Sequence, residues 1–124
     1  MQTKSLYERL GGYDTIAAVV DDLLQRLFSD PQVGVYWKGH SNNSKKRERQ
    51  TLVNYMCQAA GGPVVYSGRD MKTSHEGLGI SESDWQVTAG HMITTLEKFN
   101  VPEQEKQEVL AFVSSLKGDI VEKA

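Results

Sequence analysis

Apolar residues recur at helical spacing along most of this chain, and strand-like alternation is scarce. Side chains three and four positions apart share one face of an α-helix, so each apolar stripe predicts a helix that buries that face against its neighbours. Four long stripes occur, within residues 16–28, 52–60, 85–99 and 109–121. The pattern therefore predicts an all-α fold built on four substantial helices.

Glycine-rich breaks separate these stripes. Gly11-Gly12 and Gly61-Gly62-Pro63 interrupt the helical pattern, because glycine and proline punctuate helices. After the first break, Asp14 or Thr15 is predicted to cap the following helix, since side-chain oxygens of these residue types accept the free amides of a first turn.

Helix starts are also marked in the second half of the chain. Ser81 and Asp84 form an S-x-x-D capping box, and Pro102 suits the first turn of the last helix. The polar stretch Lys38–Arg47 is predicted to be a surface loop that leads into the second long helix.

Length and composition limit the classes of protein to which this chain can belong. The 124 residues fit one domain, 1–124, and 39% apolar residues with a net charge of −2 argue against disorder, a nucleic-acid partner and an acidic-lipid partner. No signal-peptide pattern and no apolar run of membrane-spanning length occur, so we expect a cytoplasmic protein. Cys57 is the sole cysteine, which excludes an internal disulfide and the CxxCH attachment of c-type haem.

His75 stands in the stretch GRDMKTSHEGLG, between glycines. On a helix, Met71, His75 and Leu78 would form an apolar strip interrupted by one imidazole. Such a strip suits a flat apolar ligand that carries a metal. By itself it fits an ordinary buried or exposed histidine better.

Several longer segments help to decide whether His75 is a metal ligand or an ordinary histidine. Through them the chain resembles the group I truncated haemoglobins from about Ser5 to Val121. The likeness is carried by SLYERLGG (5–12), VVDDLLQRLFSDPQV (19–33), YMCQAAGGPVVYSGR (55–69), GRDMKTSHEGLGI (68–80) and AGHMITTL (89–96). The resemblance implies a truncated globin: a two-over-two helical sandwich around a haem pocket, with a reduced first helix and an irregular segment before the ligating histidine.

The resemblance assigns His75 as the metal ligand, with one ring nitrogen on iron and the other N–H bonded to backbone. It places Tyr66, Arg69 and Lys72 near the haem propionates and Trp37 against the haem. For any one contact position alone, core packing is the simpler interpretation. The full set of positions that the resemblance assigns to the cofactor is Leu24, Trp37, Leu52, Met56, Tyr66, Met71, Lys72, Leu78, Ile80, Trp85, Thr88 and Met92.

The distal side departs from the family pattern. Where many relatives carry a tyrosine and a glutamine that hydrogen-bond the gas, this chain has Leu24 and Leu52, with Glu48 at the nearby gating position. Losing two hydrogen bonds of about 1.5–3 kcal/mol each would weaken oxygen retention by orders of magnitude.

Two alternatives stay open for the distal side. Trp37, Thr51 or a water supplies a donor, or the loop shifts the helix so that Gln50 or His40 enters. In the second case His40 or Lys46 would occupy the sixth position on iron.

Three further expectations concern single groups. Glu48 is predicted to point outward toward Lys45 or Arg49, because a carboxylate in an apolar pocket is costly. His91 is predicted to be a partly buried structural histidine. Some relatives bond a histidine of the last helix to the haem; residues 114–121 contain none, so noncovalent haem b is expected.

The expected function is reversible binding of oxygen, carbon monoxide or nitric oxide by a cytoplasmic monomer. Nitric oxide sensing, or its dioxygenation as a side activity with a reductase as electron donor, would follow from the family. One alternative is a haem-free helical interaction module that reuses the fold. A peroxidase-like enzyme is a third, although no distal histidine or arginine is evident.

Overall fold

A computed structural model describes residues 4–68 and 70–123 and consists of helices joined by short connections. Arg69, one of the residues expected near the propionates, lies outside the described residues. The elements are α1 (Leu6–Leu10), α2 (Tyr13–Ser29), the 3₁₀ helix η1 (Gly34–Trp37), α3 (Asn42–Ala59), α4 (Met71–His75), α5 (Glu82–Lys98), α6 (Glu103–Ser115) and α7 (Lys117–Ile120).

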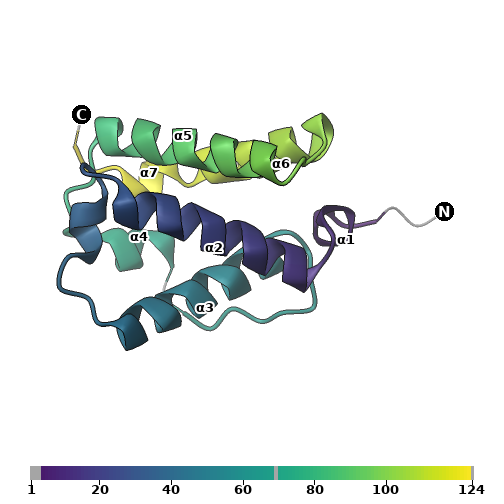
Figure 1. The fold of residues 1–124 in the computed structure, drawn as a ribbon, viewed down its shortest axis with the longest axis horizontal. Helices are drawn as coiled ribbons and strands as arrows, with labels where there is room; N and C mark the ends of the chain where they lie inside the picture. Colours follow the sequence, from purple (N-terminus) through teal and green to yellow (C-terminus); the bar gives the residue numbers. More distant parts are fainter. Residues whose placement is uncertain (1–3, 69, 124) are drawn as a thin grey trace.

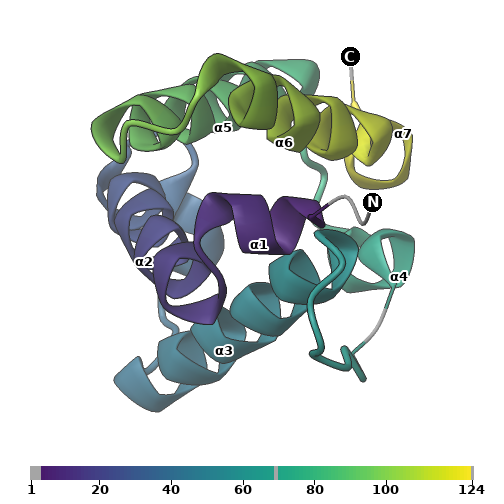
Figure 2. The same ribbon diagram turned by 90° about the vertical axis from the view of Figure 1, so that its right-hand side faces the viewer.

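The four long helices form two antiparallel pairs, one over the other (Figure 1). The pair of α5 and α6 covers the pair of α2 and α3, and α2 packs against both α3 and α5. Figure 2 shows the short α1 lying across one end of this arrangement, between α6 and α3. The predicted all-α, two-over-two architecture is confirmed.

Apolar stripes of the long helices meet in one core. The α2 stripe contributes half of it, and α3, α5 and α6 each add one or two buried side chains, because each helix turns one face inward. The most deeply buried members are Val20, Val53, Cys57, Leu96 and Val33. The fourth predicted stripe is interrupted, since α6 ends at Ser115 and α7 begins at Lys117.

Helix starts follow the sequence signals in the second half of the chain. The Ser81 hydroxyl accepts the Asp84 amide, and the Asp84 carboxylate accepts the Ser81 amide, so the predicted capping box is present. The last long helix, α6, begins directly after Pro102, at the predicted place.

Two boundary predictions are wrong. The N-cap of α2 is Gly12, with φ +83°, and no side chain caps that helix, so neither Asp14 nor Thr15 has the predicted role. The polar stretch Lys38–Arg47 is not all loop: α3 begins at Asn42, because the Ser41 hydroxyl caps it by accepting the Ser44 amide.

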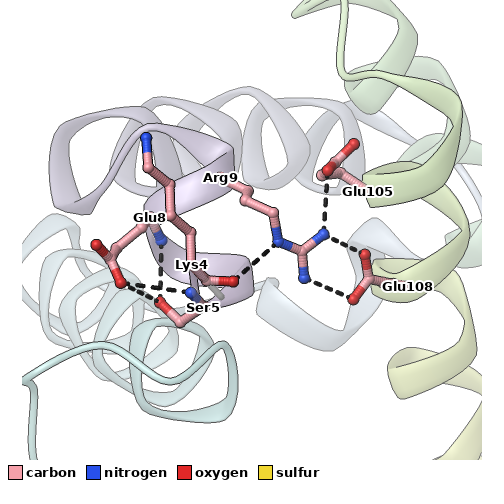
Figure 3. A network of polar contacts seen from close by, with 6 residues as sticks. All are labelled: Lys4, Ser5, Glu8, Arg9, Glu105 and Glu108. Carbon is pink, nitrogen blue, oxygen red and sulfur yellow. Dashed lines mark hydrogen bonds and ion pairs between the residues drawn. The ribbon is translucent and has the colours of Figure 1, made fainter. Parts of the chain in front are cut away.

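One guanidinium fixes α1 to the bundle (Figure 3). Arg9 Nη1 donates to Glu105 at 3.0 Å and also to Glu108, while Nη2 donates to Glu108 Oε1 at 2.8 Å. Arg9 Nε donates to the Lys4 carbonyl at 3.2 Å. These contacts join the first helix to α6 across 96 or more positions of sequence.

At the glycine break after α3, the backbone passes close to the Tyr7 ring. Gly61 has φ +89°, in the left-handed region that favours glycine, and a Cβ on Gly62 would lie 2.5 Å from Tyr7 Cδ2. The Tyr7 amide donates to the Ala60 carbonyl at 2.8 Å, so α1 is hydrogen-bonded to this turn.

A buried carboxylate ties η1 to the start of α5. Asp84 Oδ2 accepts the Tyr36 hydroxyl at 2.6 Å, and Oδ1 accepts Gln32 Nε2 at 2.7 Å. The Tyr36 hydrogen bond is the main cause that lowers the pKa of Asp84 to about 2, and the same bond raises the pKa of Tyr36 to about 12. The segment that carries Trp37 is thereby held against α5.

Within the described residues, no helix is both long enough and apolar enough to span a bilayer.

Replacing Gly62 by Ala is expected to destabilise the protein by about 1–3 kcal/mol, because the new methyl group would overlap the Tyr7 ring. Gly90→Ala is the matched control: apart from its own stretch of α5, no described residue lies within 4 Å of its Cβ position, so it should stabilise by about 0.5–1 kcal/mol. Urea denaturation measures both. Equal stabilities for the two variants would contradict the close contact.

Tyr36→Phe is expected to lower stability at neutral pH by about 1–3 kcal/mol, because the buried Asp84 loses a donor. Asp84 has a depressed pKa, so its contribution is full above pH 3.8 and is lost as the pH falls toward 2. The difference in unfolding free energy between wild type and variant should therefore shrink as the pH falls from 3.8 toward 2. Tyr13→Phe, which removes an exposed hydroxyl, should differ from the wild type by an amount that does not change over this pH range. Denaturation at a series of pH values measures both differences.

Candidate haem site

His75 is the last residue of α4, a single short helix. Asp70 caps this helix by accepting the Thr73 amide at 2.7 Å, and five residues later the helix ends at the histidine. The imidazole is half-buried. Its Nδ1 lies 2.8 Å from the Met71 carbonyl oxygen and 3.0 Å from Ser74 Oγ.

These contacts fix the tautomer of the ring. A carbonyl oxygen only accepts, so Nδ1 carries the proton and donates it to Met71. The Ser74 hydroxyl donates to the same carbonyl at 3.2 Å and can accept from Nδ1. In the neutral ring Nε2 then carries the lone pair, and no hydrogen bond joins it to another described residue. A neutral imidazole held at Nδ1 with Nε2 free is the donor that haem iron requires.

Several apolar side chains before and after His75 in the sequence lie outside the helical core. Met71, Ile80 and Trp85 are half-buried and Leu78 is 48% exposed, and none of these packs against the core of the described residues. Lys72 is exposed on α4. Apolar side chains outside the core suit the flat apolar face of a porphyrin, and the exposed Lys72 suits its carboxylates, so the chemistry of the residues present fits a haem.

The α5 positions assigned to the haem share a helix face. Trp85 and Thr88 are half-buried and Met92 is buried, one turn further along. On the opposite pair of helices, Leu52 and Met56 of α3 are half-buried. Three of these five side chains, Leu52, Met56 and Met92, meet at one cavity.

That cavity lies inside the sandwich and is lined by α1, α2, α3, α5 and α6. Its volume is about 70 Å³, which is room for a diatomic molecule, and its walls are almost entirely apolar. Leu23 of α2 forms part of the wall, whereas Leu24 is 6% exposed within the core and does not line the cavity. Val109 and Phe112 of α6 also line it.

Two aromatic positions assigned to the haem contact other rings. Trp37, half-buried in η1, meets Phe28 edge to face with the ring centroids 5.2 Å apart. Tyr66 lies in the irregular segment before α4 and meets Tyr55 in the same manner at 5.1 Å.

The residues named as alternative distal donors have partners elsewhere. Gln50 Nε2 donates to the Tyr13 hydroxyl at 2.8 Å, and Thr51 Oγ1 donates to the Arg47 carbonyl at 2.8 Å. Lys46 is exposed. None of these side chains lines the apolar cavity.

Glu48 differs from its prediction. Its Oε1 lies 2.9 Å from His40 Nδ1, and its Oε2 is buried with no hydrogen-bond partner among the described residues. The predicted pairing with Lys45 or Arg49 is wrong, because Lys45 Nζ lies over the Phe28 ring and Arg49 Nε donates to Asp21 at 2.5 Å.

His91 is the partly buried structural histidine that the sequence predicted. Its Nε2 lies 2.8 Å from Asp30 Oδ2, joining α5 to the turn after α2. This contact is the main cause that lowers the pKa of Asp30, whose other oxygen accepts the amides of Gln32 and Val33.

Sequence reasoning missed the side chains that depend on helix packing. Leu23 belongs to the same stripe as Leu24, and only the placement of α3 and α5 shows which one faces the cavity. Ser74, which shares the Met71 carbonyl with His75, had one available signal: a hydroxyl three residues after that carbonyl on a helix can reach it.

The sequence profile of the bacterial-like globin family matches residues 5–122. A group 1 truncated haemoglobin from Mycolicibacterium paratuberculosis is 31% identical over 116 residues, covering 94% of this chain and 83% of that protein. A group 1 truncated haemoglobin from a Nostoc species is 29% identical over 119 residues, covering 96% and 98%.

Solved structures show the same architecture. The truncated haemoglobin from Tetrahymena pyriformis in its Fe(III) form superimposes with a TM-score of 0.86 at 19% identity, covering 95% of this chain and 98% of that one. The 2/2 haemoglobin from a Synechococcus species, in its cyanomet state with covalently attached haem, gives 0.85 at 25% identity, with the same coverage of 95% and 98%.

Proposed function

Because this chain belongs to the bacterial-like globin family and is a group 1 truncated haemoglobin, we propose that it binds a diatomic gas at a haem iron held by His75. Membership of this family supports haem-based gas binding. The observation that supports His75 as the ligand is its Nδ1 hydrogen bond to the Met71 carbonyl, 2.8 Å, which leaves Nε2 free to donate a lone pair.

When bound, the haem supplies a ferrous iron with an open coordination position that takes oxygen, carbon monoxide or nitric oxide. The protein holds and shields it. His75 would supply the nitrogen that holds the iron, and the Met71 carbonyl orients the ring by accepting its Nδ1–H. Trp85 and Ile80 present half-buried apolar surface that excludes water, and we propose Lys72 and Tyr66 as partners of the propionates.

We place gas binding or sensing above efficient nitric oxide dioxygenation. Dioxygenation needs oxygen to be retained and an electron donor, which would be a reductase. We propose that the internal cavity receives the gas. Its wall includes Leu52 and Leu23 but no amide or phenol, so oxygen would be retained weakly compared with carbon monoxide.

The haem is proposed to be haem b held without a covalent bond. Residues 114–121 contain no histidine that could bond to the haem, in contrast with the Synechococcus protein and its covalently attached haem. A cytoplasmic location and a monomeric state are part of the same proposal and rest on the sequence.

We also propose that the sixth position is left to the gas. His40, one of the two internal ligands considered, is engaged with Glu48 at 2.9 Å. Lys46 is exposed on α3, away from the cavity wall.

Replacing His75 by Gly is expected to abolish the ferrous five-coordinate and carbonyl spectra of the haem-loaded protein, because the axial nitrogen is lost. Added imidazole should restore them. His91→Gln is the matched control, since the His91 Nε2 is bonded to Asp30, and it should keep the wild-type spectra.

The same optical spectra decide between the alternatives. A wild-type protein that shows no Soret band and takes up no hemin would favour the haem-free interaction module. A low-spin six-coordinate ferrous spectrum would show that an internal side chain closes the sixth position.

Leu52→Gln is expected to slow oxygen dissociation about tenfold or more, since one hydrogen bond to the polarised gas is worth about 1.5–3 kcal/mol. The carbon monoxide dissociation rate should change little and serves as the control ligand. Leu52 is chosen because it lines the cavity. Unchanged oxygen kinetics, measured by stopped flow, would show that residue 52 does not reach the gas.

A further inference from the structure

The last described residues of the chain form a strap, residues 121–123, across the segment that follows His75. Both carboxylate oxygens of Glu122 accept backbone amides of that segment: Oε2 accepts the Gly77 amide at 3.1 Å and Oε1 accepts the Gly79 amide at 2.8 Å. One side chain near the C-terminus therefore binds the chain two and four positions after the candidate ligand.

The backbone of the strap is fixed as well. The amides of Glu122 and Lys123 both donate to the Ile80 carbonyl, at 2.8 and 3.2 Å, and the Glu82 amide donates to the Lys123 carbonyl at 2.9 Å. Lys123 also forms a parallel bridge with Ser81. Because the strap is bonded on both sides of the Glu122 side chain, the carboxylate is held where the two amides reach it.

The bound segment adopts a conformation that suits this contact. Gly77 has φ +84° and Gly79 has φ +70°, values that residues with side chains rarely adopt. A Cβ on Gly79 would lie 3.1 Å from Lys123 Cε, so the Lys123 side chain passes close to the Gly79 backbone. The two amides are the main cause that lowers the pKa of Glu122, so the carboxylate is charged at neutral pH and its hydrogen bonds are strengthened.

The helix that carries His75 needs support from outside itself. It has five residues, too few to be stable alone, and an irregular segment precedes it. Both polar contacts of the His75 ring, to Met71 and Ser74, lie within this helix, so the ring moves with it. The helix packs against α7, which leads directly into the strap.

We propose that Glu122 is a positioning residue for the haem-ligating histidine: its carboxylate fixes the segment from Gly77 to Gly79, and through it the orientation of α4 and of the His75 ring toward iron. This inference rests on the proposed function, since it takes His75 as the ligand.

The test uses the haem-loaded ferrous protein and the variants Glu122→Gln and Glu122→Ala. The glutamine keeps the size of the side chain and leaves one amide without an acceptor, and the alanine leaves two. Glu76→Gln is the matched control: it removes one negative charge next to His75 from an exposed side chain with no hydrogen bond to the strap. Far-UV circular dichroism confirms that each variant is folded.

Two measurements separate positioning from general stability. The first is the iron–histidine stretching band in the resonance Raman spectrum, and the second is the rate of hemin transfer to excess apomyoglobin. We expect both Glu122 variants to shift the band and to lose hemin faster, the alanine by about tenfold, as for partners that orient a metal ligand. Glu76→Gln should leave both unchanged.

A wild-type band in folded Glu122→Ala and Glu122→Gln would overturn the inference, and so would an equal shift in Glu76→Gln, which would make charge the cause. These outcomes differ from failure of the proposed function. That failure would appear as absence of a Soret band in the wild type, or as an iron–histidine band that is still present in the His75→Gly variant.

Discussion

A single hydrogen bond inside a five-residue helix decides what the His75 ring can do. Because Nδ1 donates to the Met71 carbonyl, the lone pair of the neutral ring lies on Nε2. Much of the remaining fold is apolar: the two helix pairs leave an apolar cavity between them, and α5 carries Trp85 and Thr88 on one face. The protein thus supplies one strong donor and otherwise mainly apolar surface.

The sequence was informative where structure is local. Four apolar stripes located the four long helices, and the Ser81–Asp84 box placed the start of α5, because both signals act within a few residues. The start of α2 was misjudged, since Gly12 adopts a left-handed conformation there and no side chain caps the helix. The α3 start was missed because Ser41 lies inside a polar run that looked like loop.

The candidate site was predictable in part. His75 stood out through its neighbours in sequence, and the family resemblance gave it a role. Contacts between distant elements could not be found this way: Tyr36 reaches Asp84 across 48 positions, and Glu122 reaches Gly77 across 45. Glu48 was assigned the wrong partner for the same reason, since the competing contacts of Lys45 and Arg49 come from α2.

The apolar cavity also affects how the fold responds to its surroundings. A void of about 70 Å³ disappears when the chain unfolds, so the unfolded state occupies less volume. Hydrostatic pressure should therefore weaken this sandwich more than one with a filled interior. An inert atom such as xenon, lodged in the void, would oppose that effect by binding only the folded state.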